Sequence, residues 1–440
     1  MWPYHPDLLA RPVPRYTSYP TAAEFTDAVS SDDMVQALGA VADDTPVSLY
    51  LHIPYCRAIC WYCGCNTGAA NRTGRLTAYL DRLEEEIALV AARLGGRGRI
   101  GRIAFGGGSP NAIPPAAFER LVDRVRRAFA CDNAVVSVEI DPRDFTPDWA
   151  AALARVGVSR ASLGVQTLDP ALQAAIGRIQ PIDDIRRTVT LMREAGVTSI
   201  NFDLMYGLPG QSEDALAASI EASLKMAPDR FAIFGYAHVP HLVPRQRRID
   251  ARALPDARAR FRQAAIAHWM ATSASYRAVG FDHFALPGDA LAQAAASGTL
   301  RRNFQGFTED RAEVLIGLGA SAISQFPGAL LQNEKNTGRY HMAIGAGRFA
   351  TARGVRRTAD DRRRGHAIEA LLTGGHADLT GIPGLGAIRD RLSPFVAQGL
   401  VTWDGATLAL ADHALPYARV IAVTLDAYRG DAGRRFSSAV

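Results

Sequence analysis

The chain has 440 residues, of which 48% are hydrophobic, and a formal net charge of +5. This length is enough for a sizeable core and two or three domains. It contains no apolar run near the roughly 20 residues that span a bilayer, and the residues after Met1 lack the apolar centre of a signal peptide, so we expect a cytoplasmic protein without a membrane partner. The basic residues are scattered, which favours an anionic ligand or an arginine-rich surface and gives no basic stripe for nucleic acid.

The first element in chain order is an irregular stretch at residues 15–21, which reads Arg-Tyr-Thr-Ser-Tyr-Pro-Thr. Its proline and lack of periodicity argue against a helix or a repeat. We predict that residues 1–45 form an N-terminal arm that lies over the core.

Short apolar runs then alternate with amphipathic helical patterns, and this alternation predicts parallel βα units. Helices are expected to begin after Thr146 and to stop at Gly157 and Gly196. The expected strands are residues 48–54, 102–105, 135–140, 159–165, 199–205 and 231–236, and the expected helices are 76–94, 116–129, 148–156, 184–195 and 214–225. Residues 46–240 therefore form an α/β partial (β/α)6 barrel or, alternatively, a doubly wound sheet, and both fold types bind ligands at the carboxyl ends of their strands.

After about Asp250 the pattern becomes mostly helical. Residues 241–365 are predicted to flank the barrel and to supply parts of the substrate site. Near the end, residues 400–408 indicate a hairpin around the Asp404-Gly405 turn. We expect a mostly helical, winged-helix-like domain over residues 366–440, and fold analogy alone does not make such a domain bind nucleic acid.

Four of the five cysteines, Cys56, Cys60, Cys63 and Cys65, lie within ten residues of one another. A disulfide framework is not spaced in this way, so the cluster indicates metal or redox chemistry. Cys131 stands apart from them after a helical pattern, and we expect it to be a buried small hydrophobic residue.

The first three cysteines have C-x3-C-x2-C spacing and directly follow an apolar strand. Cys56, Cys60 and Cys63 can bind three irons of a 4Fe-4S cluster and leave the fourth iron open to S-adenosylmethionine (SAM), whose cleavage yields a 5′-deoxyadenosyl radical. Zinc is the main alternative, but structural zinc usually takes two separated ligand pairs and no second pair follows. The role of Cys65 stays open between packing, substrate contact and tuning of the cluster.

Residues 106–110, Gly-Gly-Gly-Ser-Pro, follow the second expected strand. Three glycines there allow backbone groups to approach a ligand such as the amino group of SAM, although a tight βα turn explains them about as well. Their place one βα unit after the cysteines favours the ligand interpretation.

Together with this glycine run, residues 50–56 (Tyr-Leu-His-Ile-Pro-Tyr-Cys) and 60–66 (Cys-Trp-Tyr-Cys-Gly-Cys-Asn) resemble the radical SAM superfamily. The segment 14–21 and Cys65 narrow the resemblance to its oxygen-independent coproporphyrinogen III dehydrogenases. Further matching segments are residues 138–143, 163–166, 202–209, 236–238, 280–285 and 302–306, so the resemblance extends over essentially the whole chain.

The resemblance implies a pocket for two SAM molecules. The residues matching contacts to the first are Tyr50, Gly107, Glu139 and Ile323. Those matching contacts to the second are Tyr62, Gly108, Ser109, Gln166, Arg178, Asp203 and Ala237. The carboxylates of Glu139 and Asp203 can accept hydrogen bonds from ribose hydroxyls or offset the positive charge of the sulfonium. The simpler interpretation is that each acid caps a helix or forms a surface ion pair. This chain departs from the family pattern at Ser109, where threonine is common, at Trp61 and at Thr67.

The reaction implied by the resemblance is oxidative decarboxylation of two propionates of coproporphyrinogen III to vinyl groups, which gives protoporphyrinogen IX. It needs an electron donor and acceptor that the sequence does not identify, and we expect a monomer. Arginines suit a substrate with four carboxylates, and Arg15 is our candidate. His52 is either a core residue or a hydrogen-bond partner near the cluster. The alternative is a haem chaperone of the same superfamily, whose members lack the arm and the fourth cysteine.

Overall fold

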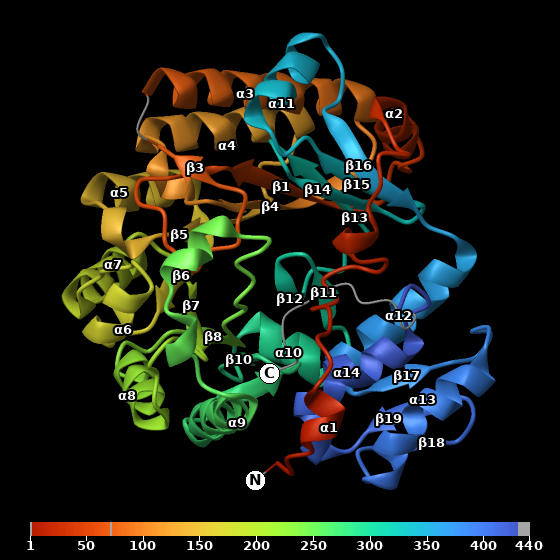
Figure 1. Cartoon of the computed structure of the whole chain (residues 1–440). Coiled ribbons are helices and arrows are strands. Elements are labelled where there is room, and N and C mark those ends of the chain that lie inside the picture. The colour runs from red at the N-terminus through yellow and green to blue at the C-terminus, as the bar shows by residue number, and fades with distance from the viewer. Residues whose placement is uncertain (1, 71–72, 430–440) are drawn as a thin grey trace.

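The computed structural model describes residues 2–70 and 73–429 (Figure 1). Within this part of the chain, twelve strands form one sheet in the order β16-β15-β14-β13-β1-β4-β5-β6-β7-β8-β10-β9. Its six central strands are parallel and follow one another in chain order: β1 (Pro46–Ile53), β4 (Arg99–Gly107), β5 (Val135–Ile140), β6 (Val158–Gln166), β7 (Ser199–Tyr206) and β8 (Arg230–Gly235). A doubly wound sheet reverses its strand order, so the consecutive order indicates the partial barrel.

Helices between these strands cover the outer face of the sheet (Figure 1). The Thr146 hydroxyl accepts a hydrogen bond from Trp149 N–H at 3.3 Å, and Gly157 ends the same helix with a φ of +67°. The helices are α3 (Thr73–Leu94), α4 (Pro115–Phe129), α5 (Pro147–Val156), α6 (Pro170–Ala175), α7 (Ile182–Glu194) and α8 (Glu213–Leu224). The predicted strands and helices of this part are confirmed, whereas the six-residue α6 and two short strands, β2 (Tyr55–Cys56) and β3 (Gly68–Ala69), were not predicted.

Alternation along β5 shows how the strands separate core from site. Val136, Val138 and Ile140 are buried in the cluster that contains Phe118 and Trp149 of the helical layer. The residues between them point to the other face of the sheet, because successive side chains of a strand alternate, and Glu139 there lines a cavity. The apolar face of each strand thus packs against the helices, and the polar face is available to a ligand.

The prediction of a mostly helical chain after Asp250 is wrong for residues 277–356. Eight short strands lie there: β9 (Arg277–Val279), β10 (His283–Ala285), β11 (Arg301–Asn303), β12 (Gly306–Thr308), β13 (Val314–Leu318), β14 (Ile323–Phe326), β15 (Ala329–Asn333) and β16 (Thr351–Arg356). The helices among and before them are α9 (Ala257–Ser273), α10 (Ala290–Ala296) and α11 (Thr337–Gly345). Runs of three to six residues are too short for periodicity to separate strand from helix. Six of these strands extend the main sheet, β13 by pairing in parallel with β1.

The C-terminal part has the predicted helices and hairpin. Asp404 Oδ1 accepts hydrogen bonds from the N–H groups of Ala406 and Thr407, at 2.9 and 2.7 Å, and closes the turn. The elements are α12 (Ala359–Gly374), β17 (His376–Asp378), α13 (Leu385–Ala397), β18 (Val401–Trp403), β19 (Thr407–Leu410) and α14 (Ala418–Ala422), with β17-β19-β18 as a small separate sheet. The hairpin beside helices agrees with the winged-helix-like prediction.

The N-terminal segment contributes to two cores. It runs from α1 (Pro6–Leu9), beside the C-terminal part, up to α2 (Ser31–Gly39), beside the main sheet (Figure 1). Tyr16 is buried in the C-terminal core and donates a hydrogen bond to Asp426 Oδ2 at 2.9 Å, whereas Leu38 is buried in the barrel core. The arm therefore ties the two parts together. The boundaries at residues 45, 240 and 365 stay a prediction.

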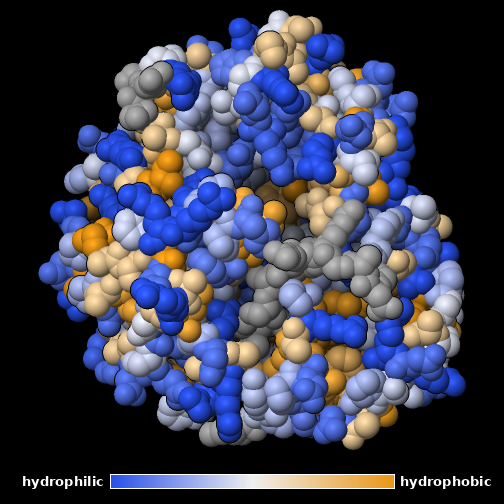
Figure 2. Space-filling model, viewed as in Figure 1, coloured by the Kyte–Doolittle hydropathy of each residue, from blue (hydrophilic) through white to orange (hydrophobic). Residues whose placement is uncertain are grey.

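The face seen in Figure 2 is mostly hydrophilic, with apolar residues scattered among the charged ones. Across the described residues, no helix is long and apolar enough to cross a membrane. Cys131 is buried, as predicted.

Glu86 of α3 is a buried carboxylate and gives a testable pH dependence. It is 1% exposed and accepts hydrogen bonds from Gly319 N–H, Asn333 Nδ2 and the Tyr340 hydroxyl at 2.6–2.7 Å. Burial nevertheless raises its pKa from 4.5 to about 7. Because the folded state holds this proton more tightly than the unfolded state, its contribution to stability is fully present below pH 4.5 and is lost as the pH rises through about 7.

We therefore expect the unfolding free energy of the wild type to fall, relative to that of Glu86→Gln, as the pH rises from 4.5 to 7. Urea unfolding of both proteins across this range measures the difference. The control is Glu85→Gln on the exposed side of the same helix, which should give a profile parallel to the wild type. A parallel profile for Glu86→Gln would contradict the prediction.

Candidate active site

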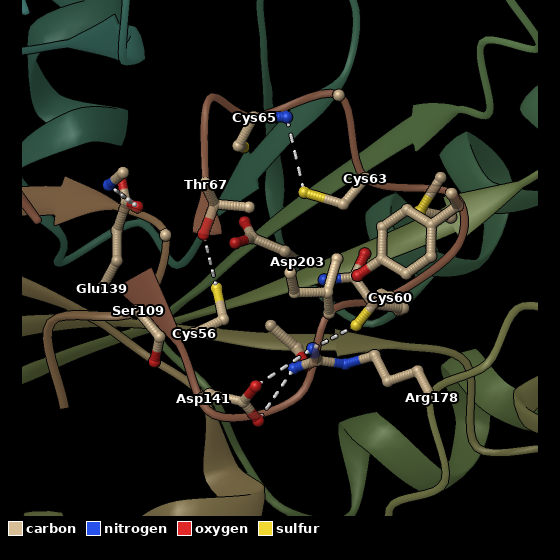
Figure 3. A pocket seen from close by; sticks show the side chains of 18 of the residues that line it. Cys56, Cys60, Cys63, Cys65, Thr67, Ser109, Glu139, Asp141, Arg178 and Asp203 are labelled. Carbon is tan, nitrogen blue, oxygen red and sulfur yellow. Dashed lines mark hydrogen bonds and ion pairs between the residues drawn. The ribbon is translucent and has the colours of Figure 1, made fainter. Parts of the chain in front are cut away.

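A cavity of about 420 Å³ opens at the carboxyl ends of the parallel strands and is lined by all four clustered cysteines (Figure 3). The other predicted site residues that line it are Tyr62, Gly107, Gly108, Ser109, Glu139, Gln166, Arg178, Asp203 and Ala237. Two predicted contacts lie outside its lining. The Tyr50 hydroxyl is 3.2 Å from His52 Nδ1, and Ile323 begins β14.

The cysteine loop leaves β1 and is folded back by two short strands, β2 (Tyr55–Cys56) and β3 (Gly68–Ala69), which pair in parallel. This fold turns the thiols of Cys56, Cys60 and Cys63 toward one space (Figure 3). The Thr67 hydroxyl donates to Cys56 Sγ at 3.2 Å, and the Cys65 N–H donates to Cys63 Sγ at 3.4 Å. The loop thus presents three sulfur atoms, and two of them are held by hydrogen bonds from the loop itself.

The third sulfur, on Cys60, receives hydrogen bonds from two arginines. Arg178 Nη1 donates to it at 3.3 Å and Arg143 Nη2 at 3.4 Å. Asp141 joins the two guanidinium groups, accepting from Arg178 at 3.2 Å and from Arg143 Nε at 3.0 Å. Burial alone would raise the pKa of Asp141, but Arg178 and Arg143 lower it below its usual value. Asp141 therefore stays ionised and holds both cations beside the sulfur.

Sequence reasoning did not assign Asp141 or Arg143 a role. The only local signal was their position directly after β5, in the matching segment 138–143. The hydrogen bond from Arg143 to Cys60 spans 83 residues, and no local pattern reveals it.

The glycine run also meets a packing requirement that the sequence did not predict. A Cβ at Gly106 would lie closer than 3.0 Å to the Glu139 carboxylate, one at Gly107 to the His52 ring, and one at Gly108 to the Tyr55 backbone. Gly107 also has a φ of +113°, which L-residues rarely adopt. The glycines are therefore needed first for packing of the cysteine loop against β4 and β5, and the cavity lies beside them.

Two carboxylates point into the cavity (Figure 3). Glu139 accepts a hydrogen bond from Gly107 N–H at 3.1 Å, and burial raises its pKa to about 7. Asp203 accepts from the Ser162 hydroxyl at 3.0 Å and from Asn201 Nδ2 at 2.8 Å, and burial raises its pKa as well. Both lie within strands, so neither is a helix cap, and neither forms a surface pair.

Gln166, at the end of β6, is strained and incompletely satisfied. Its φ is +65°, and its buried Oε1 atom has no hydrogen-bond partner. Strained backbone and unpaired buried polar atoms are concentrated at functional sites. This free acceptor fits a site that receives a polar ligand.

The residues present fit an iron–sulfur cluster better than a single ion. Within the described ranges, no three His, Cys, Asp or Glu side chains are grouped so that they could bind one and the same metal ion. Thiolates around an iron–sulfur cluster bind different irons and so stand further apart than the ligands of one zinc ion. Three sulfurs facing one cavity, beside a free Gln166 acceptor, have the arrangement that a cluster and its ligand need.

His52 combines the two roles considered for it. It is buried, its Nε2 lies 3.4 Å from the Asn66 carbonyl oxygen and 3.3 Å from the Ser321 hydroxyl, and its ring packs on Gly107. Burial lowers its pKa to about 4, so it is neutral near pH 7. It is a satisfied core residue that also supports the cysteine loop.

Comparison with known proteins agrees with this geometry. Residues 50–222 match the model of the radical SAM superfamily. The chain is 43% identical to the oxygen-independent coproporphyrinogen III oxidase of Bradyrhizobium diazoefficiens, over 97% of this chain and 96% of that protein, and 40% identical to that of Paracoccus denitrificans, over 94% of each. The solved structure of coproporphyrinogen III oxidase from Escherichia coli, described as a radical SAM enzyme, superimposes with a TM-score of 0.90 at 32% identity and covers 97% of this chain and 100% of that one.

The identities and coverage confirm the resemblance found in the sequence, and membership of the superfamily implies a 4Fe-4S cluster and SAM. The chain belongs to the oxygen-independent coproporphyrinogen III oxidase family of radical SAM enzymes.

Proposed function

We propose that this protein converts two propionate side chains of coproporphyrinogen III into vinyl groups without oxygen, giving protoporphyrinogen IX. The observation that carries the proposal is the convergence of three sulfur atoms on one cavity in a chain that matches oxygen-independent coproporphyrinogen III oxidases over nearly its whole length. When bound, the cluster and SAM supply a 5′-deoxyadenosyl radical, which removes a hydrogen atom from the propionate so that carbon dioxide and one electron leave.

We assign Cys56, Cys60 and Cys63 as the cluster ligands. The proposed contacts to a first SAM are Tyr50, Gly107, Glu139 and Ile323, and those to a second are Tyr62, Gly108, Ser109, Gln166, Arg178, Asp203 and Ala237. For these assignments, support comes from the free oxygen of Gln166 and from the two carboxylates that point into the cavity. Carboxylates suit ribose hydroxyls and a sulfonium charge. Partners of the reaction are an electron donor and an acceptor, and we propose that the protein acts as a monomer.

The chain's own residues also shield the site. Tyr62 and Met205 line the cavity beside the polar groups, and apolar walls exclude water from a reactive centre. The Arg143–Asp141–Arg178 group holds Cys60 in a fixed position. No nucleophile–base pair is needed, because hydrogen-atom removal requires little acid–base help.

An anaerobic assay tests the proposed function. The reconstituted protein is incubated with SAM, a reductant and coproporphyrinogen III, and the products are identified by mass spectrometry. We expect loss of two carbon dioxide units per substrate together with formation of 5′-deoxyadenosine. Tight haem binding without any vinyl product would support a haem chaperone, and a colourless protein without iron would support the zinc alternative.

A further prediction concerns Arg143. Hydrogen bonds to a ligand sulfur raise the reduction potential of an iron–sulfur cluster because they stabilise its more negative, reduced form. We expect Arg143→Gln to lower the potential, by roughly 40 mV for each kcal/mol of stabilisation lost, in a redox titration followed by electron paramagnetic resonance.

The matched control is Arg57→Gln. Arg57 lies on the cysteine loop and carries the same charge, but it pairs with Asp144 at 3.8 Å. Its replacement should leave the potential nearly unchanged. Equal shifts in the two variants would show that general charge, and not the hydrogen bond to Cys60, sets the potential.

A further inference from the structure

A small polar cavity outside the active site lies where the arm, the main sheet and the C-terminal part meet, beside the point at which the red arm passes β11 in Figure 1. Its volume is about 50 Å³, which is room for a few water molecules or one small anion. It shares no lining residue with the active-site cavity. Its walls include Tyr16 and Tyr19 of the arm, Arg301 and Arg302 of β11, Arg357, and Glu369 of α12.

Positive charge dominates the lining of this cavity. Arg301, Arg302 and Arg357 line it, and Glu369 is the one acid among the described residues that do so. Glu369 is already engaged, because its Oε1 atom accepts hydrogen bonds from Arg301 Nε at 2.9 Å and from the main-chain N–H of Arg302 at 2.8 Å. With His366 counted as neutral, three arginines against one glutamate leave the lining with two excess positive charges.

Arg357 contributes a guanidinium that no acid holds by a hydrogen bond within the described residues. Its buried Nε atom has no hydrogen-bond partner there. Asp361 and Glu369 attract it, yet burial lowers its pKa. The Asp361 carboxylate instead accepts hydrogen bonds from Thr358 and Tyr428, all at 2.8–2.9 Å. The Arg357 side chain is therefore still able to donate to a ligand.

Arg302 is the second arginine with a nitrogen that lacks a partner. The residue is 8% exposed, and its Nη2 and Nε atoms donate to the carbonyl oxygens of Arg15 and Tyr16 at 3.1 and 3.2 Å. Its buried Nη1 atom has no hydrogen-bond partner in the described part of the chain. A buried polar atom without a partner is costly. Two such guanidinium nitrogens on one cavity point to an acceptor that both can share.

The arm is strained where it borders this cavity. Tyr16 has a φ of +49°, a conformation that residues other than glycine rarely adopt. It is held by the hydrogen bond from Arg302 Nε to its carbonyl oxygen and by the bond from its hydroxyl to Asp426 at 2.9 Å. Arg15, the preceding residue, lines the active-site cavity. Whatever fixes Arg302 therefore also fixes the arm beside the active site.

We propose that this cavity binds a small tetrahedral oxyanion such as inorganic phosphate between Arg302 and Arg357, and that the bound anion holds the arm in place. A doubly charged oxyanion matches the two excess charges of the lining, and arginine is the side chain best suited to donate to such oxygens. The cavity is too small for a porphyrin, so the site is separate from the substrate site and does not depend on the proposed reaction.

Isothermal titration calorimetry of the reconstituted protein with inorganic phosphate, under anaerobic conditions and at constant ionic strength in chloride, measures the site. We expect one phosphate per chain with a Kd at or below about 1 mM, and Arg357→Gln should raise this Kd about 10- to 100-fold. Arg363→Gln is the matched control, because Arg363 is an exposed arginine of the same helix α12 that does not line the cavity. It should leave the Kd unchanged.

Hydrogen exchange of the wild type, followed by mass spectrometry, gives a readout that does not depend on any variant folding. Saturating phosphate should slow exchange of the arm amides at residues 14–21, relative to chloride at the same ionic strength. It should not change exchange in α4, on the outer face of the barrel. In Arg357→Gln the same phosphate concentration should leave the arm unaffected.

Three results would overturn the proposal: no saturable phosphate binding below about 10 mM, an unchanged Kd in Arg357→Gln, or binding that does not slow exchange in the arm. Phenyl phosphate tests the source of the anion, because its ring does not fit a cavity of about 50 Å³. We expect it to bind more weakly than phosphate. Equal binding of the two would show that the site takes the phosphate group of a larger molecule and not a free oxyanion.

Discussion

Replacing Cys60 by alanine should abolish the visible absorbance of the reconstituted cluster and the formation of 5′-deoxyadenosine. Cys60 is the buried member of the three ligands and the one whose sulfur receives two guanidinium hydrogen bonds. Without it the site keeps two thiolates, and a cube with three protein-bound irons cannot be held. Iron and sulfide analysis, together with chromatography of the SAM products, measures the effect, and Cys56→Ala and Cys63→Ala should behave in the same way.

Cys65→Ala is the matched control for this loss. Cys65 lies on the same loop, and alanine retains its main-chain N–H contact with the Cys63 sulfur at 3.4 Å while losing the side-chain hydrogen bond between the two thiols. We expect the variant to keep its iron and sulfide. Loss of iron from Cys65→Ala, or its retention in Cys60→Ala, would show that the ligand set is assigned wrongly.

The second large effect is expected for Gly107→Ala. A Cβ there would collide with the His52 ring, and the φ of +113° is unfavourable for alanine. Overpacking costs about 1–3 kcal/mol and left-handed backbone about 1–2 kcal/mol, so the apparent unfolding free energy should fall by about 2–5 kcal/mol. Urea unfolding of the reconstituted protein measures this change, and SAM binding should weaken as well because the Gly107 N–H that holds Glu139 is displaced.

Gly210→Ala separates the two causes. Gly210 has a φ of +76°, but a Cβ there would meet nothing within 4 Å. It should therefore lose only the backbone part, about 1–2 kcal/mol. If Gly107→Ala were no more destabilised than Gly210→Ala, the contact with His52 would not be the constraint that we infer.

Sequence periodicity was enough for the six parallel strands and the helices between them. In β5, for example, buried and partly buried residues alternate, and in α4 apolar residues recur with helical spacing. Such elements are long enough that the burial of one face produces a regular pattern of apolar residues in the sequence. The family could also be recognised from the sequence, because the three cluster cysteines and the glycine run lie in short continuous segments.

The short strands and the long-range contacts of the site depend on tertiary structure. The short strands β13 to β16 have too few residues for a period, and they are stable only because they extend an existing sheet at β1. Arg143 gains its role by meeting Cys60, and Asp141 by holding Arg143 and Arg178 beside that sulfur. Arg15 meets Arg302 and Arg419 only when the arm lies between the barrel and the C-terminal part. A sequence determines local periodicity and local chemistry. Contacts between residues tens to hundreds of positions apart depend on how the packed elements are placed, and that placement exists only in the folded chain.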